Sequence, residues 1–207
     1  MLLLNPSLVN LQKVLAALKL GAVVAMPTET AYGLIADSSN KKAVKKIYAI
    51  KGRKPDKPLP LICSSFFQVE KFFYLPSIMR KLAKQFWPGP LSLQLKVKNI
   101  AGKKIAVPAW QNTLVVRVSA DDTLRYLARR LGCPLTATSA NLSGKGELYS
   151  SVDVVKQFSR RKVKPDIIWQ AGKIPKRKPS TIIGKDKTGK LIVLREGAIP
   201  MADLNKI

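Results

Sequence analysis

The chain has 207 residues, of which 46% are hydrophobic, and 37 Lys and Arg against 12 Asp and Glu give a net charge of +25. This length and apolar content predict one sizeable globular domain and exclude a disordered basic tail, because such tails have low hydrophobicity. The chain has no histidine, which excludes a Ser-His-Asp triad, a Cys-His pair, an HExxH site and any His-ligated metal.

The two cysteines and the N-terminus restrict the function further. Cys63 and Cys133 lie far apart and lack CxxC spacing, so we expect two buried, reduced thiols rather than thiolate zinc or a redox pair. The segment MLLLNPSL lacks the charged region and long apolar stretch of a signal peptide. No apolar run of about 18 residues occurs, so we expect a cytoplasmic protein without a membrane span.

Local patterns in the first half of the chain predict three helices and two strands. Ser7 caps a helix with apolar positions up to Leu18 and a stop at Gly21, and Asn40 caps a second helix. A third helix spans 77–87 and ends at the turn 88–90. The short apolar runs 22–26 and 59–63 are typical of buried strands.

The second half of the chain is richer in strands. Residues 91–98 alternate strictly between apolar and polar side chains, which predicts a strand with one polar face. Further strands are expected at 114–118, 135–138, 167–169, 181–183 and 191–194, with helices at 123–131 and 152–158. Because helices and strands alternate without a regular βαβ period, we predict an α/β domain with a twisted mixed sheet and flanking helices, not a doubly wound one.

Two polar segments follow predicted elements in the first half. In 27–34, three hydroxyls, Glu29 and Gly33 come directly after a buried strand, where α/β folds place ligands, although a polar connecting loop would look the same. In 51–60, alternating cations in a loop rich in proline suit phosphate, because Arg offers a bidentate fork and Lys a point charge. A solvated basic turn is the alternative for that segment.

Three more polar segments follow in the second half. Residues 136–144 combine hydroxyl and amide side chains with Gly144, so backbone N–H groups could approach an anion closely; the spacing of a Walker A loop is absent. Residues 178–181 lead into a predicted strand, and 195–197 end another. Each segment alone is a weak signal.

Together and in this order, PTETAYGL, KGRKPDKPL, WPGPLSL, NTLVVRVS, TSANLSG, PSTII and LREG resemble the YrdC/Sua5 (TsaC) family of L-threonylcarbamoyladenylate synthases. The resemblance covers about residues 8–200 and implies a single YrdC-like domain over 1–207, with a concave basic cleft, of the short bacterial type. It also implies a reaction in which L-threonine, bicarbonate (or CO2) and ATP give threonylcarbamoyl-AMP and pyrophosphate. The product supplies the t6A modification of tRNA.

The resemblance also assigns roles to residues. Lys51 and Arg53 would contact the phosphates and be catalytic, and the full ATP-binding set would be Lys51, Arg53, Lys57, Thr113, Ser139, Asn141 and Arg195. The threonine-binding set would be Thr30, Tyr32, Arg117, Ala137 and Ser180. No protein-held metal is expected, because Glu29 is the only carboxylate in the first motif; Mg²⁺ would arrive with ATP.

These residue types suit the chemistry, because negative charge gathers among three phosphates and a carbamate and must be offset by cations and hydroxyls. Two positions depart from the family pattern. Lys57 stands where many relatives carry Asn, and Ile62 stands where the pattern has a histidine. Ile62 cannot hydrogen-bond threonine, so that contact would be lost or supplied by backbone.

The surplus charge exceeds what a three-substrate pocket needs. Basic clusters at 41–46, 160–164 and 173–178 predict salt-dependent binding of RNA phosphates, with tRNA and the tRNA-modifying transferase complex that uses the intermediate as expected partners. A lysine-rich surface without any partner is the alternative. Two other functions stay open: a non-catalytic RNA-binding or ribosome-maturation factor, and a module that carbamoylates a different amine. Lys51, Arg53, Ser139 and Asn141 favour the enzyme.

Overall fold

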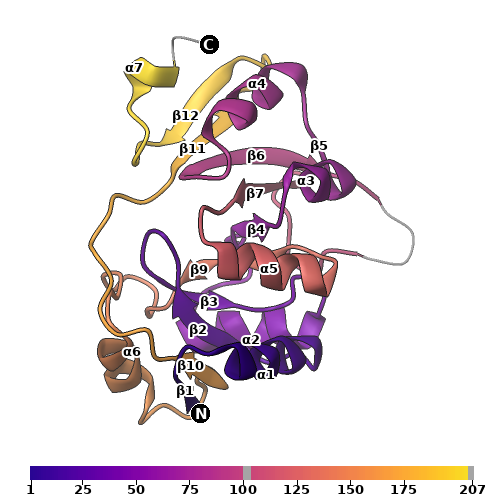
Figure 1. The fold of residues 1–207 in the computed structure, drawn as a ribbon. Helices are drawn as coiled ribbons and strands as arrows, with labels where there is room; N and C mark the ends of the chain where they lie inside the picture. Colours follow the sequence, from indigo (N-terminus) through magenta and orange to yellow (C-terminus); the bar gives the residue numbers. More distant parts are fainter. Residues whose placement is uncertain (100–103, 205–207) are drawn as a thin grey trace.

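The strands of the protein form two mixed sheets, which lie one above the other in Figure 1. The computed structural model describes residues 1–99 and 104–204. Within these residues, the smaller sheet has five strands in the order β1-β10-β2-β3-β9. The first three are parallel to one another and the last two run antiparallel to their neighbours. The strands are β1 (Leu2–Leu4), β10 (Ile167–Trp169), β2 (Val24–Pro27), β3 (Tyr32–Ile35) and β9 (Thr138–Ser139).

The larger sheet, over the same described residues, has the order β12-β11-β6-β7-β4-β8, with β5 beside β6. The pairs β11–β6 and β4–β7 are parallel and the others are antiparallel. Its strands are β4 (Leu61–Cys63), β5 (Phe73–Tyr74), β6 (Leu91–Val97), β7 (Thr113–Val118), β8 (Leu135–Thr136), β11 (Thr181–Lys185) and β12 (Leu191–Arg195).

Helices cover both sheets. In Figure 1, α1, α2 and α6 lie by the smaller sheet, α3 and α4 by the larger one, and α5 between them. α5 packs against β4 and against α1, while α6 packs against β10. The helices are α1 (Leu8–Lys19), α2 (Lys41–Lys51), α3 (Phe66–Phe72), α4 (Ser77–Phe86), α5 (Asp122–Leu131), α6 (Ser151–Phe158) and α7 (Met201–Leu204). No helix in the described parts of the chain is long and apolar enough to cross a bilayer.

The predicted helix starts are confirmed by their caps. The Ser7 hydroxyl accepts a hydrogen bond from the Asn10 N–H, and Asn40 Oδ1 accepts from the N–H groups of Lys42 and Ala43. These side chains satisfy donors that the first turn of a helix leaves without a partner. The α/β class with mixed strand pairing is likewise confirmed.

One predicted strand is wrong in an informative way. The run 135–138 is not a single strand, because Leu135 and Thr136 pair with β4 of the larger sheet while Thr138 pairs with β3 of the smaller one. The chain passes from one sheet to the other at Ala137, whose N–H donates to the carbonyl of Pro60 at 2.8 Å. Both halves of the segment have the residue pattern of a strand. Periodicity alone therefore cannot show that the chain changes sheets between them.

The sequence also missed several short elements, namely β1, β3, α3, β5 and α7. Buried apolar side chains form two clusters: a large one around both sheets, and a smaller one between α1, α5 and the neighbouring strands. Cys63 and Cys133 are buried thiols, as expected. The two sheets and the crossing between them determine where the polar motifs meet.

Candidate active site

A cavity of about 330 Å³ lies where the two sheets meet. Its charged lining side chains are three arginines and Glu147, and hydroxyl-bearing residues and prolines form much of the rest. Of the twelve residues predicted for the site, eight line this cavity: Thr30, Tyr32, Arg53, Arg117, Ala137, Ser139, Ser180 and Arg195. Motifs separated by more than a hundred residues of sequence therefore converge on one space.

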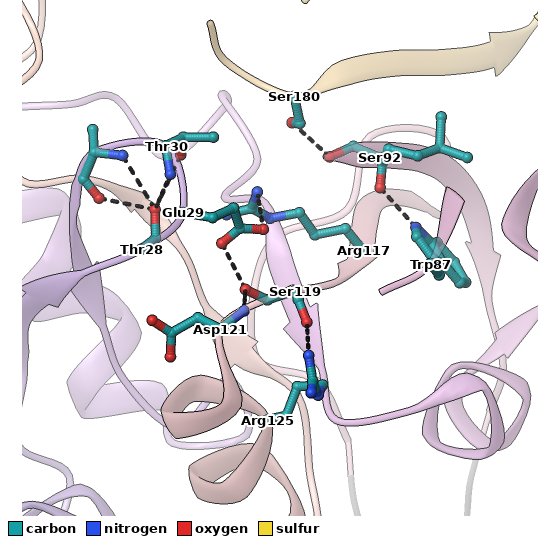
Figure 2. Close-up of polar contacts among 12 residues, drawn as sticks. Thr28, Glu29, Thr30, Trp87, Ser92, Arg117, Ser119, Asp121, Arg125 and Ser180 are labelled. Carbon is teal, nitrogen blue, oxygen red and sulfur yellow. Dashed lines mark hydrogen bonds and ion pairs between the residues drawn. The ribbon is translucent and has the colours of Figure 1, made fainter. Parts of the chain in front are cut away.

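The first motif forms the turn between β2 and β3, not a strand-to-helix loop. Thr28 Oγ1 donates to the carbonyl of Ala31 at 2.8 Å and accepts from the N–H groups of Thr30 and Ala31. Its hydroxyl also lies 3.0 Å from that of Thr30. This hydroxyl-centred turn holds Thr30 at the cavity, and Figure 2 shows its hydrogen bonds.

Arg117 and Glu29 form a buried ion pair beside the cavity. Arg117 Nη1 lies 2.8 Å from Glu29 Oε1, and each side chain is only 10% exposed. The Ser119 hydroxyl donates to the other Glu29 oxygen at 2.6 Å, so the carboxylate is held from two sides (Figure 2). Burial lowers the pKa of Arg117, and the carboxylates of Glu29 and Asp121 oppose that shift. The pair thus keeps a guanidinium oriented in a site that excludes most water.

A second arginine of the cavity lining, Arg195, is held by Ser180. Arg195 donates from Nε and Nη2 to the Ser180 carbonyl and from Nη2 to the Ser180 hydroxyl at 3.0 Å. The hydroxyls of Ser180 and Ser92 lie 2.8 Å apart (Figure 2). Burial lowers the pKa of Arg195; the Glu147 carboxylate raises it and the Arg117 cation lowers it further. Both arginines line the same cavity, so they can act on one ligand.

Arg53 enters the cavity from the proline-rich loop after α2. Its guanidinium donates to the carbonyls of Lys57 and Pro58 at 3.3 and 3.1 Å, which pins it against its own loop. Lys57 is exposed and does not line the cavity. Of the loop cations predicted to bind phosphate, the structure places Arg53 at the cavity and Lys57 outside it.

The placement expected for Lys51 is wrong. Lys51 is the last residue of α2 and not part of the loop expected over 51–60, because Gly52 ends the helix with φ +59°. The Lys51 side chain is buried and donates to the carbonyls of Ser139 and Asn141 and to Asn141 Oδ1. Burial lowers its pKa to about 8, nearby Arg53 adds to that shift, and Glu147 opposes it.

Asn141 belongs to the same buried cluster. The Ser139 hydroxyl donates to Asn141 Oδ1 at 2.6 Å, while Ser139 itself lines the cavity. Lys51 and Asn141 therefore lie behind the cavity wall, where they hold the backbone of 139–141 in place. They support the site without lining it.

Three other residues singled out in the sequence occupy different surroundings. Thr113 lies further along β7, where its hydroxyl accepts from Gln94 Nε2, and it does not line the cavity. Tyr32 lines the cavity, but its hydroxyl donates to the Gly172 carbonyl, and burial raises its pKa. Ile62 pairs with Arg117 in register but packs into the apolar cluster by α5, so it offers the cavity nothing.

Sequence reasoning missed Ser92, Glu147 and the pairing of Glu29 with Arg117. The alternation in 91–98 did place Ser92 on a polar face, but nothing in it indicated Ser180 as a partner. Glu29 was visible only as a lone carboxylate. Contacts between residues about 90 positions apart, such as the Ser119–Glu29 hydrogen bond, carry no local signal.

The described residues do not offer a metal site. Among residues 1–99 and 104–204, no three His, Cys, Asp or Glu side chains lie close enough together to hold an ion. Glu29, the nearest carboxylate to Arg117, is occupied by that cation and by Ser119. The donor set therefore does not fit a resident Mg²⁺, a cation that prefers oxygen ligands in a near-ideal octahedron.

Comparison with known proteins identifies the family. The sequence model of the Sua5/YciO/YrdC family, described as telomere recombination, matches residues 16–197. A Methanocaldococcus jannaschii protein provisionally named threonylcarbamoyl-AMP synthase is 37% identical over 186 residues, covering 89% of this chain and 84% of its own length. The threonylcarbamoyl-AMP synthase of Vibrio vulnificus is 40% identical over 141 residues, covering 67% of this chain and 75% of that protein.

Solved structures agree with this assignment. The Pyrococcus abyssi Sua5 protein in complex with L-threonine superimposes with a TM-score of 0.85 at 31% identity and covers 99% of this chain. This chain spans 59% of the length of that protein. Escherichia coli YciO shares the fold with a TM-score of 0.81 at 21% identity. From the sequence match over most of its length and from these relatives, the chain belongs to the Sua5/YciO/YrdC family.

Proposed function

We propose that the protein is an L-threonylcarbamoyladenylate synthase that serves the t6A modification of tRNA. The observation that carries this proposal is the cavity in which Arg117, Arg53 and Arg195 surround a hydroxyl-rich wall. Relatives named threonylcarbamoyl-AMP synthase at 37% and 40% identity support the reaction. The structure of the related Pyrococcus abyssi protein with L-threonine supports this amino acid as a ligand.

Arg117 would bind the carboxylate of L-threonine. A guanidinium matches a carboxylate in geometry, and a buried one binds it more strongly than an exposed one. Glu29 balances the charge of the guanidinium in the free protein, and the threonine carboxylate would compete with it for Arg117. Thr30 and Ser180 would offer hydroxyls to the amino acid, and Ala137 and the Tyr32 ring would limit the space around its methyl group.

Arg53 and Arg195 would bind the phosphates of ATP. In the reaction, an oxygen of the threonine carbamate attacks the α-phosphorus, a new O–P bond forms, and the bond to the β-phosphate breaks to release pyrophosphate. Negative charge develops on the oxygens of both groups, where fixed cations are most effective. Ser139 adds a hydroxyl on the wall that Lys51 and Asn141 support.

The remaining partners follow from this proposal. ATP and bicarbonate are substrates of the reaction, and Mg²⁺ would enter bound to ATP. Lys57 and Thr113 lie outside the cavity, so contacts from them to ATP require a ligand that extends beyond it. The basic clusters would meet tRNA or the transferase complex that consumes the product, and the expected location is the cytoplasm, where tRNA is modified.

The decisive experiment is pyrophosphate release from ATP in bicarbonate buffer, measured with each of the twenty amino acids. The proposal expects release with L-threonine that disappears when bicarbonate is removed. Release with a different amine would support the carbamoylation alternative. Folded protein without any release would support the non-catalytic RNA-binding alternative and overturn the proposal.

A further inference from the structure

A second groove, of about 300 Å³, lies on the larger sheet away from the cavity. We call it the Trp110 groove; its lining includes Tyr74, Lys96, Trp110, Thr113 and Lys185. Lys96 of β6 pairs with Tyr74 of β5 on one side and with Thr113 of β7 on the other, so the three form a row across the sheet. Pro76 and Met79 are also among the lining residues.

Part of the Trp110 groove shares a sheet face with the cavity. Ser92 lines the cavity, whereas Gln94 and Lys96 line the Trp110 groove, and alternate residues of a strand point to one face. Four residues along β6 correspond to about 13 Å. The two sites are thus neighbours on one polar surface without being one pocket.

A strained turn presents Trp110 to solvent. Gln111 and Asn112 have φ of 48° and 58°, a region that side chains other than glycine seldom adopt. The turn is closed by hydrogen bonds from the Thr113 N–H and hydroxyl to the Trp110 carbonyl at 2.8 and 2.7 Å. Trp110 is 57% exposed, whereas Trp87 and Trp169 are buried. Backbone strain of this kind tends to occur at ligand sites.

The charged residues that line the groove are both lysines. Lys96 and Lys185 are exposed and line it, and none of its lining residues is acidic. Lys98 places its ammonium 5.3 Å from the centre of the Tyr74 ring, so part of that ring is covered. Trp110 therefore offers the larger free aromatic surface, with cations beside it.

We infer that the Trp110 groove binds an unpaired nucleotide of a single-stranded nucleic acid, with its base stacked on Trp110 and its neighbouring phosphates near Lys96 and Lys185. Aromatic side chains stack any base, and flanking cations follow the phosphate backbone. The two lysines argue against the adenosine end of ATP as the ligand. If the phosphates of ATP lie in the cavity, its adenosine brings no negative charge to the groove. This inference does not depend on synthase activity.

The test is fluorescence anisotropy with a short, fluorescein-labelled single-stranded RNA of mixed sequence at low salt. Trp110→Leu should weaken binding about tenfold, because base stacking contributes that much in such sites. Trp110→Phe, which keeps a ring, should retain most of the affinity. Phe67→Leu removes another exposed aromatic residue, on α3, and serves as the matched control with unchanged binding.

Two further measurements separate this site from the cavity. Pyrophosphate release by Trp110→Leu should match that of the unaltered protein, and saturating ATP should not displace the RNA. Equal RNA binding by Trp110→Leu and the unaltered protein would overturn the inference. Displacement of the RNA by ATP, with a raised KM for ATP in Trp110→Leu, would instead assign the groove to ATP and also overturn it.

Discussion

Lys51 donates to both oxygens of Asn141, the backbone carbonyl and Oδ1, each at 2.9 Å. A third hydrogen bond, to the Ser139 carbonyl at 2.6 Å, uses the last donor of the ammonium. The end of α2 is thereby tied to the 139–141 segment, about 90 residues later in the chain. Lys51 and Arg53 are close in sequence but have different surroundings, so their substitutions should have different consequences.

Arg53→Ala should lower pyrophosphate release by at least ~100-fold, because it removes a fixed cation from the place where phosphate charge develops. Its thermal unfolding temperature should change little, since its own hydrogen bonds are confined to its loop. Lys54→Ala, at an exposed neighbouring position, is the control and should keep full activity. Normal release by folded Arg53→Ala would rule out a phosphate role.

Lys51→Ala, unlike Arg53→Ala, should reduce both the activity and the stability of the protein. It leaves buried carbonyl oxygens without a donor, which destabilises a fold by about 2–4 kcal/mol in total. Urea unfolding of Lys51→Ala beside Arg53→Ala measures the difference. An unfolding midpoint equal to that of the unaltered protein would show that Lys51 does not hold the 139–141 segment.

The pH dependence of stability should report the Lys51 ammonium. Its pKa in the folded protein is about 8, below the ordinary value of 10.5, so between these values the unfolded chain binds the proton and the folded one does not. Stability therefore rises with pH across this interval and is flat below it. Relative to Lys51→Met, the unaltered protein should gain about 1.5 kcal/mol between pH 8 and 9.5. A difference that stays constant would mean that Lys51 remains protonated.

Glu29→Gln should make the free protein less stable but more responsive to L-threonine. The variant leaves the buried Arg117 without its counter-charge, which should destabilise the fold by about 3 kcal/mol. The threonine carboxylate can then supply that charge without repulsion from Glu29. The shift in unfolding temperature produced by saturating L-threonine should exceed that of the unaltered protein, and a smaller shift would contradict this competition for Arg117.

L-threonine should be used in preference to L-serine by roughly 10- to 200-fold, since an extra methyl group in an apolar pocket is worth only about 1–3 kcal/mol. Val115, Ala137 and Ile182 provide apolar lining for that methyl group. The ratio of kcat/KM values from pyrophosphate release measures the preference. Equal use of serine would contradict the threonine assignment.

Binding of tRNA should weaken steeply with salt, because a net charge of +25 acts through the release of counterions from the phosphates. Filter binding at a series of salt concentrations gives the slope of log K against log salt. Binding that does not change with salt, or no binding at low salt, would indicate that the basic clusters do not bind tRNA.

The amino-acid sequence by itself determined the helix starts at Ser7 and Asn40 and the polar face of β6, because caps and side-chain alternation act between residues a few positions apart. Its ordered motifs also contain most of the residues that line the cavity. The tertiary structure alone decided which of them lie in it. Arg117 and Glu29 pair because β7 lies next to the β2–β3 turn. The predicted strand is divided at Ala137 because the residues before it pair with one sheet and the residues after it pair with the other. Lys51 is buried because residues 139–141 offer it three acceptors, and such partners, distant in sequence, leave no mark on the residues around it.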